Sequence, residues 1–206
     1  TPFTTTVQTG GSTSSRTQPV IRSAAAPTIA LFFMPQISNK GPHHPHWWPV
    51  DYIYRMDSKQ AIVSNWLPRY TGVALEEFGE YILLPNFNSY VELFAREHGV
   101  PVVGQDKSMP SATAGEVTMI NFGMGSANAA TIMDLLSAIS PKAVLFLGKC
   151  GALKSKNKLG DLILPLAGIR GEGTSNDYFP PEVPAMPSFA LQRAVSSTIR
   201  DYNCDY

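Results

Sequence analysis

Apolar and polar positions alternate along this chain in two periods, which together predict strands and helices in turn from residue 58 onward. Apolar runs as long as buried strands cover 81–84, 117–122, 143–147 and 161–164. Apolar residues recur at helical spacing over 58–66, 89–98, 127–139 and 187–200. Because strands that alternate with helices usually form a mostly parallel sheet with right-handed crossovers, the pattern predicts an α/β fold. It leaves 104–115 as an exposed connection.

A glycine loop joins the predicted strand 117–122 to the predicted helix 127–139. It contains Gly123, Gly125 and Ser126. At the carboxyl end of a strand in an open α/β sheet, glycines let the backbone approach a ligand, and unpaired N–H groups of the next helix favour an anion. The loop alone leaves two interpretations open, a ligand-binding loop and a tight turn without ligand contact.

Two common nucleotide motifs are excluded at this loop. The dinucleotide fingerprint requires a third small residue where this chain has Asn128, and no well-placed acidic residue follows. No Lys-Ser or Lys-Thr pair closes a P-loop. The sequence therefore supports neither NAD nor a P-loop nucleotide, and we expect no cofactor.

A second glycine loop favours the ligand-binding interpretation. It covers 148–153, Gly-Lys-Cys-Gly-Ala-Leu, directly after the apolar run 143–147. A basic turn then leads to Gly-Asp-Leu-Ile-Leu-Pro at 160–165. Two loops that suit a ligand thus flank one predicted crossover helix, as expected for a site at the carboxyl edge of a sheet.

Four segments, in order along the chain, carry a resemblance to a known family. They are Pro-Arg-Tyr-Thr-Gly at 68–72, Tyr-Ile-Leu-Leu-Pro-Asn-Phe at 81–87, the two glycine loops with the Gly-Asp strand after them, and Arg-Gly-Glu-Gly-Thr-Ser-Asn-Asp-Tyr-Phe-Pro-Pro at 170–181. Over residues 57–206 the chain resembles the AMP nucleosidases of the purine nucleoside phosphorylase and nucleosidase superfamily. The resemblance implies a three-layer nucleoside-phosphorylase-like α/β fold and hydrolysis of the N-glycosidic bond of AMP to adenine and ribose 5-phosphate.

The same resemblance implies a set of substrate-binding residues. Gly123, Gly125, Ser126 and Asn128 would shape the sugar pocket, and 149–151 would close the side of the base. The full set of candidates is Arg69, Tyr70, Asn86, Gly123, Gly125, Ser126, Asn128, Lys149, Cys150, Gly151, Arg170 and Glu172.

Arg69 and Arg170 are the candidates for the 5′-phosphate of AMP, because an arginine fork can donate two parallel hydrogen bonds to a phosphate. The alternative for each is a structural ion pair at the surface. A nucleophilic Cys150 is conceivable, but no histidine lies in the neighbouring motifs, which favours a packing role.

One departure within the superfamily indicates the nucleophile. Phosphorylases of this type carry an arginine on the strand before the second loop and a hydroxyl residue in that loop, and both hold phosphate. Here the strand has Phe146, and the loop offers Lys149 and Cys150. Water is therefore the favoured nucleophile, and a purine nucleoside phosphorylase remains an alternative.

A second departure concerns the proton donor for the purine. In the superfamily the catalytic Asp and a ribose-binding Met-Glu pair lie on later strands, so we expect them beyond Tyr206. We therefore expect 56–206 to be the N-terminal portion of a C-terminally truncated catalytic domain. Glu172 and Asp177 are weaker acid candidates, since a loop carboxylate is more often a turn residue or a cap. A catalytically incomplete nucleotide-binding or oligomer-forming relative is the alternative function.

Composition sets expectations for partners and compartment. The formal net charge of +0 gives no reason to expect nucleic acid as a partner, and no apolar run is long enough to span a membrane. Two cysteines, Cys150 and Cys204, suit a reducing compartment, so we expect a cytoplasmic protein. The resemblance implies a homo-oligomer, commonly a hexamer, that binds AMP.

Residues 1–55 differ in composition from the rest of the chain. They are rich in Thr, Ser, Pro and Gly, which predicts a disordered extension. Arginine and serine without acidic residues before Asp51 leave an organellar transit peptide as the alternative. The histidines at 43, 44 and 46 lack a fourth ligand at helical spacing, so we expect no metal site.

Overall fold

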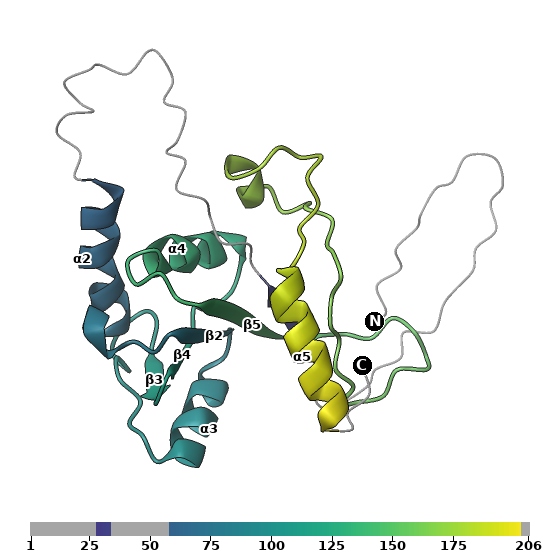
Figure 1. Ribbon diagram of the computed structural model, residues 1–206, viewed down its shortest axis with the longest axis horizontal. Helices are drawn as coiled ribbons and strands as arrows, with labels where there is room; N and C mark the ends of the chain where they lie inside the picture. The colour runs from purple at the N-terminus through teal and green to yellow at the C-terminus, as the bar shows by residue number, and fades with distance from the viewer. Residues whose placement is uncertain (1–27, 34–57, 203–206) are drawn as a thin grey trace, which may run out of the picture.

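The computed structural model describes residues 28–33 and 58–202, which form a five-stranded mixed sheet with helices on both faces (Figure 1). The strands are β1 (Thr28–Phe33), β2 (Tyr81–Pro85), β3 (Ser111–Ala114), β4 (Val117–Ile120) and β5 (Ala143–Cys150). The helices are α2 (Lys59–Thr71), α3 (Asn88–His98), α4 (Ser126–Leu136) and α5 (Phe189–Asp201), with two 3-10 turns, η1 (Leu75–Glu77) and η2 (Thr174–Asp177). The predicted helices are thus confirmed, but α2 extends five residues beyond its predicted end at 66 and α4 ends three residues before its predicted end at 139.

The centre of the sheet is parallel. Its order is β1-β5-β2-β4-β3, in which β2 pairs in parallel with both β5 and β4. The two edge strands, β1 and β3, run antiparallel to their neighbours. The predicted α/β fold with a mostly parallel central sheet is confirmed.

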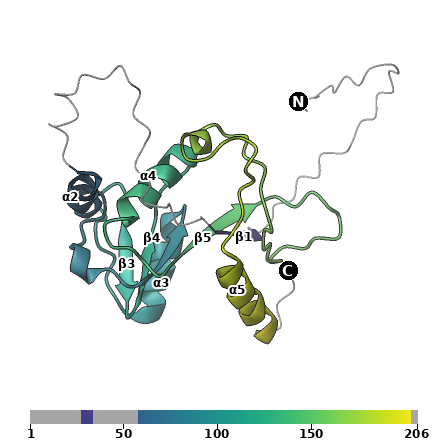
Figure 2. The ribbon, with the colours of Figure 1, turned by 45° about the horizontal axis from the view of Figure 1, so that its top comes forward.

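The fold has three layers, with helices on either side of the sheet (Figure 2). An apolar cluster packs against each face of the sheet. Alternate residues of each strand point to opposite faces. Ile82 and Ile120 therefore join α2 and α4 in one cluster, whereas Leu83 and Met119 join α3 in the other. Burial on both faces explains why the central strands are continuous apolar runs.

Two sequence predictions fail at the margins of this sheet. The connection 104–115 is not exposed throughout, because Ser111–Ala114 forms β3 and buries Ser111 and Ala112. Its small side chains gave no apolar run, yet a hairpin with β4 provides a partner. The predicted strand at 161–164 is wrong, since no extended strand forms there. The edge of β5 that β2 leaves open is paired with β1.

Strand β5 is also longer than predicted, and its extension depends on β1. Gly148, Lys149 and Cys150 were expected in a loop, but they pair with Ala30, Ile29 and Thr28. Disorder therefore does not describe all of 1–55. The other residues of that segment, including the histidines at 43–46, lie outside the described residues, and the domain division at residue 55 stays a prediction.

Gly104 is required by a close approach between two segments. A Cβ atom there would lie 1.9 Å from the carbonyl oxygen of Thr71, at the end of α2. Gly99, which ends α3, has a similar φ of 65° against 69°, but its Cβ would meet nothing within 4 Å. Comparing substitutions at the two glycines therefore distinguishes the cost of backbone strain from the cost of steric crowding.

We predict that Gly104→Ala destabilises the protein more than Gly99→Ala. The left-handed conformation should cost an alanine about 1–2 kcal/mol at either position. Crowding against Thr71 should add roughly 1–3 kcal/mol at position 104 alone. Urea unfolding of both variants measures the difference, and equal losses would show that the approach of Gly104 to α2 is not tight.

Candidate functional site

The candidate site lies where the three parallel strands end. Asn86 follows β2, the glycine loop follows β4, and Gly151 follows β5. Because β5, β2 and β4 are adjacent and parallel, these positions share one edge of the sheet. The topology thus brings the first glycine loop and the part of the second that follows β5 to one edge, where open α/β sheets commonly bind ligands.

Two asparagines hold the first glycine loop. The side-chain carbonyl of Asn121 accepts a hydrogen bond from the Gly123 N–H at 2.9 Å, and its amide donates to Asn88 at the start of α3. Gly123 and Gly125 have φ angles of 80° and 96°, which side chains rarely adopt. Sequence reasoning missed Asn121 and Asn88, although an asparagine between a strand and a glycine loop is a typical turn-forming residue.

Ser126 begins α4, and its hydroxyl is hydrogen bonded. The preceding residue, Gly125, occupies the N-cap position and offers no side chain to cap the helix. Ser126 Oγ lies 2.9 Å from Thr174 Oγ1 of η2, which places residues 48 positions apart in contact. Asn128, in the first turn of the helix, is exposed and its amide lies close to Gly123.

Lys149 lies on β5 beside the start of α3. Its ammonium group is 4.5 Å from the ring centroid of Phe87 and 5.1 Å from that of Tyr90. Contacts of this kind are attractive because the face of an aromatic ring is negative. The neighbouring Cys150 is a half-buried free thiol.

Arg170 orders its own segment. Its Nε donates to Val183 O at 2.7 Å, and its two terminal nitrogens donate to the carbonyl oxygens of Ser175, Phe179 and Pro180. Since an arginine has five N–H donors in a fixed fork, these bonds occupy all three nitrogens. The structure therefore gives Arg170 a role in shaping 170–183, and its predicted contact with phosphate stays a prediction.

Glu172 caps the 3-10 turn η2. Its carboxylate accepts a hydrogen bond from the Ser175 N–H at 2.7 Å. Hydrogen bonding from Ser175 is the main reason why the pKa of Glu172 lies below its usual value, with a smaller contribution from the charge of Arg170. A general acid needs a raised pKa, so this geometry favours the capping role over proton donation. Asp177, the other acid candidate, ends η2 and its side chain is exposed.

The expected catalytic Asp falls outside the described part of the chain. The resemblance places it beyond Tyr206, and Tyr206 itself lies past residue 202, where the described residues end. The structure therefore does not test the position of that Asp. Its place on a later strand, together with the C-terminal truncation of the catalytic domain, stays a prediction.

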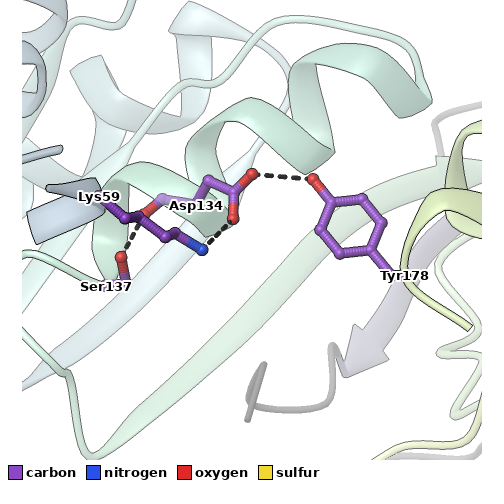
Figure 3. Close-up of polar contacts among 4 residues, drawn as sticks. All are labelled: Lys59, Asp134, Ser137 and Tyr178. Atoms are coloured by element: carbon purple, nitrogen blue, oxygen red, sulfur yellow. Dashed lines mark hydrogen bonds and ion pairs between the residues drawn. The ribbon is translucent and has the colours of Figure 1, made fainter. Parts of the chain in front are cut away.

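Asp134, on α4, links three parts of the fold (Figure 3). Its carboxylate accepts a hydrogen bond from Tyr178 at 2.9 Å and forms an ion pair with Lys59 of α2 at 2.8 Å. Burial, followed by the hydrogen bond to Asp134, raises the pKa of Tyr178 to about 12. The phenol therefore stays protonated and donates to Asp134 throughout the neutral range.

The remaining candidates lie around this edge or on α2. Asn86 has a buried side-chain oxygen without a hydrogen-bond partner among the described residues. Tyr70 stacks on Trp66 at 5.9 Å, and its backbone carbonyl accepts a hydrogen bond from Met109. Arg69 is exposed in the last turn of α2 and forms no ion pair within 28–33 and 58–202. Within the described residues, Arg69 thus keeps its donors available.

We predict that Tyr178→Phe lowers the free energy of unfolding by about 1 kcal/mol, because the partly exposed carboxylate of Asp134 loses one donor. The folded pKa lies above the unfolded value of 10.0. The contribution of Tyr178 should therefore be constant below about pH 10 and disappear as the pH rises toward 12.

Unfolding of the wild type and of Tyr178→Phe at several pH values checks this prediction. Tyr90→Phe is the matched control, because it keeps the ring near Lys149 and removes a hydroxyl without a hydrogen bond in the described part of the chain. A loss for Tyr90→Phe as large as that for Tyr178→Phe would contradict the role of Asp134.

Comparisons with known proteins identify the family. The sequence matches the Phosphorylase superfamily over residues 78–205. It is 28% identical to the AMP nucleosidase of Escherichia coli K12 over 82% of this chain and 42% of the relative. No helix of the described residues is long and apolar enough to cross a membrane.

Two solved structures share the fold. The crystal structure of an AMP nucleosidase from Bacteroides thetaiotaomicron is 63% identical, with a TM-score of 0.69, over 73% of this chain and 64% of that protein. A uridine phosphorylase from Vibrio fischeri is 22% identical, with a TM-score of 0.59, over 65% of this chain and 58% of that protein. This chain thus spans less than two thirds of each of these relatives. With a family match over more than half of its length, the chain belongs to the phosphorylase superfamily.

Proposed function

We propose that the protein hydrolyses the N-glycosidic bond of AMP to release adenine and ribose 5-phosphate. The observation that carries this proposal is the 63% identity to the AMP nucleosidase from Bacteroides thetaiotaomicron. The edge formed by Asn86, the glycine loop and Gly151 is where the substrate would bind, since this is where open α/β sheets bind ligands.

Water is the proposed nucleophile, because Phe146 occupies the strand position at which related phosphorylases present an arginine. Phe146 packs edge to face on Phe122, with ring centroids 5.6 Å apart, as part of the apolar cluster against α2 and α4. An apolar contact of this kind offers no hydrogen bond to a phosphate nucleophile, whereas a nucleotide hydrolase does not need one.

The reaction also needs a proton for the departing purine. Glu172 is a poor donor, because its hydrogen bonds favour the ionised form. We therefore propose that another acid protonates the purine. Lys149 and Gly151 close the side of the base in this proposal, and the glycine loop with Ser126 contacts the sugar phosphate.

The assembly and compartment belong to the same proposal. The family resemblance supports a homo-oligomer, commonly a hexamer, and the low cysteine content supports the cytoplasm. AMP is the proposed small-molecule partner, and nucleic acid is not expected because the net charge is +0.

The test is product analysis with AMP in phosphate-free buffer. We expect adenine and ribose 5-phosphate, at a rate that added phosphate does not increase. A requirement for phosphate, with ribose 1,5-bisphosphate as the product, would identify a phosphorylase. Binding of AMP without any release of adenine would identify the non-catalytic relative instead.

Arg69 is the proposed contact for the 5′-phosphate, since its donors are not used by the described residues, whereas those of Arg170 are. We predict that Arg69→Lys lowers kcat/KM for AMP about tenfold and leaves turnover of adenosine nearly unchanged, because a lysine cannot form the bidentate contact. Arg170→Lys is the comparison, and it should impair both substrates by loosening 170–183. Equal losses for AMP and adenosine in Arg69→Lys would rule out its role.

A further inference from the structure

Residues 170–183 form a folded segment that docks on α4. Arg170 holds the segment together through its hydrogen bonds to backbone carbonyls. Two side chains then attach it to the helix, Thr174 to Ser126 and Tyr178 to Asp134, each at 2.9 Å. Figure 3 shows the second of these attachments.

The two attachments lie eight residues apart on α4, which corresponds to roughly 12 Å along the helix axis. A single hydrogen bond would let the segment rotate about one point, whereas two at this separation fix its orientation. Lys59 restrains Asp134 from the opposite side through the ion pair with α2. The contact between Tyr178 and Asp134 therefore helps the Thr174 hydroxyl to hold Thr174 at the first turn of α4.

The Ser126 hydroxyl depends on this contact for its orientation, because the N-cap residue beside it offers no side chain to hold it. Gly125 before it has a φ of 96°, supplies no capping side chain, and leaves open space where a Cβ would lie. The hydrogen bond that the structure gives to the Ser126 hydroxyl runs to Thr174. A serine hydroxyl otherwise rotates freely about its Cα–Cβ and C–O bonds.

We propose that Thr174 is a positioning residue that orients the Ser126 hydroxyl toward the sugar phosphate of the nucleotide. The identity of the substrate in this inference rests on the proposed function. The orientation of the Ser126 hydroxyl rests on its contact with Thr174. When Thr174 donates its proton to Ser126 Oγ, the proton of Ser126 is free to donate to an oxygen of the substrate. One hydroxyl thus orders another across the site.

Three variants test the proposal on the complete protein. Thr174→Val removes the hydroxyl and keeps the shape, whereas Thr174→Ser keeps the hydroxyl. Thr131→Val is the control for loss of a threonine hydroxyl on α4, because Thr131 donates to Ala127 O of its own helix. We expect kcat/KM for AMP to fall about tenfold in Thr174→Val, to return to within about twofold in Thr174→Ser, and to stay unchanged in Thr131→Val.

A double-mutant cycle separates orientation from packing. If Thr174 acts through Ser126, Ser126→Ala combined with Thr174→Val should lose no more activity than Ser126→Ala alone. Independent, additive losses would overturn the proposal. An unchanged kcat/KM in Thr174→Val, or a loss in Thr174→Ser equal to that in Thr174→Val, would overturn it as well.

Hydrogen exchange distinguishes failure of this proposal from failure of the proposed function, since it needs no turnover. Amide exchange over 123–130 should be faster in Thr174→Val than in the wild type and Thr174→Ser. If the wild type releases no adenine, the proposed function fails. In that case faster exchange in Thr174→Val alone supports the positioning contact, and equal exchange in all three proteins overturns it.

Discussion

The parallel pairing of β2 with both β4 and β5 is the constraint on which the rest of the structure depends. It brings the ends of three strands to one edge, although Asn86, Gly123 and Gly151 are far apart in the sequence. It also requires a helix on each face of the sheet, because parallel strands need crossovers and bury both faces. The positions of α3 and α4 at the edge follow from it.

The edge contains few permanent charges, which affects how it could hold a nucleotide. Two of the three charged residues of the 170–181 motif, Arg170 and Glu172, are used to shape their own segment, and the third, Asp177, is exposed. Recognition there would therefore depend on hydroxyls, amides and backbone N–H groups, with Lys149 over two aromatic rings as a nearby cation and Arg69 of α2 as the proposed contact for the phosphate. Such a site can orient a neutral sugar, and the proposed function takes the proton for the purine from another acid.

The sequence predicted the parts of the fold in which local pattern and tertiary environment agree. Runs such as 143–147 are apolar because both faces of the sheet are covered, so the strand and its burial share one signal. Strand β3 gave no such signal, because its Ser, Ala and Thr side chains are small and its pairing with β4 comes from a hairpin. Likewise, the apolar run does not predict that β5 continues through Lys149 and Cys150, because these residues pair with β1, which is distant in the sequence.

The candidate site shows the same division between what is local and what is not. The glycines could be identified because their conformation is a local property, and their φ angles of 80° and 96° agree with it. The hydrogen-bond partners of side chains, by contrast, depend on residues that are distant in the sequence. The sequence around an arginine is the same whether its guanidinium group binds a phosphate or donates to the carbonyl oxygens of Val183 and Phe179. Likewise, the sequence around Ser126 does not indicate its hydrogen bond to a threonine 48 positions away. The roles of such residues are set by the contacts that the fold creates. A matched motif can therefore locate a site, but it does not establish the role of each residue within it.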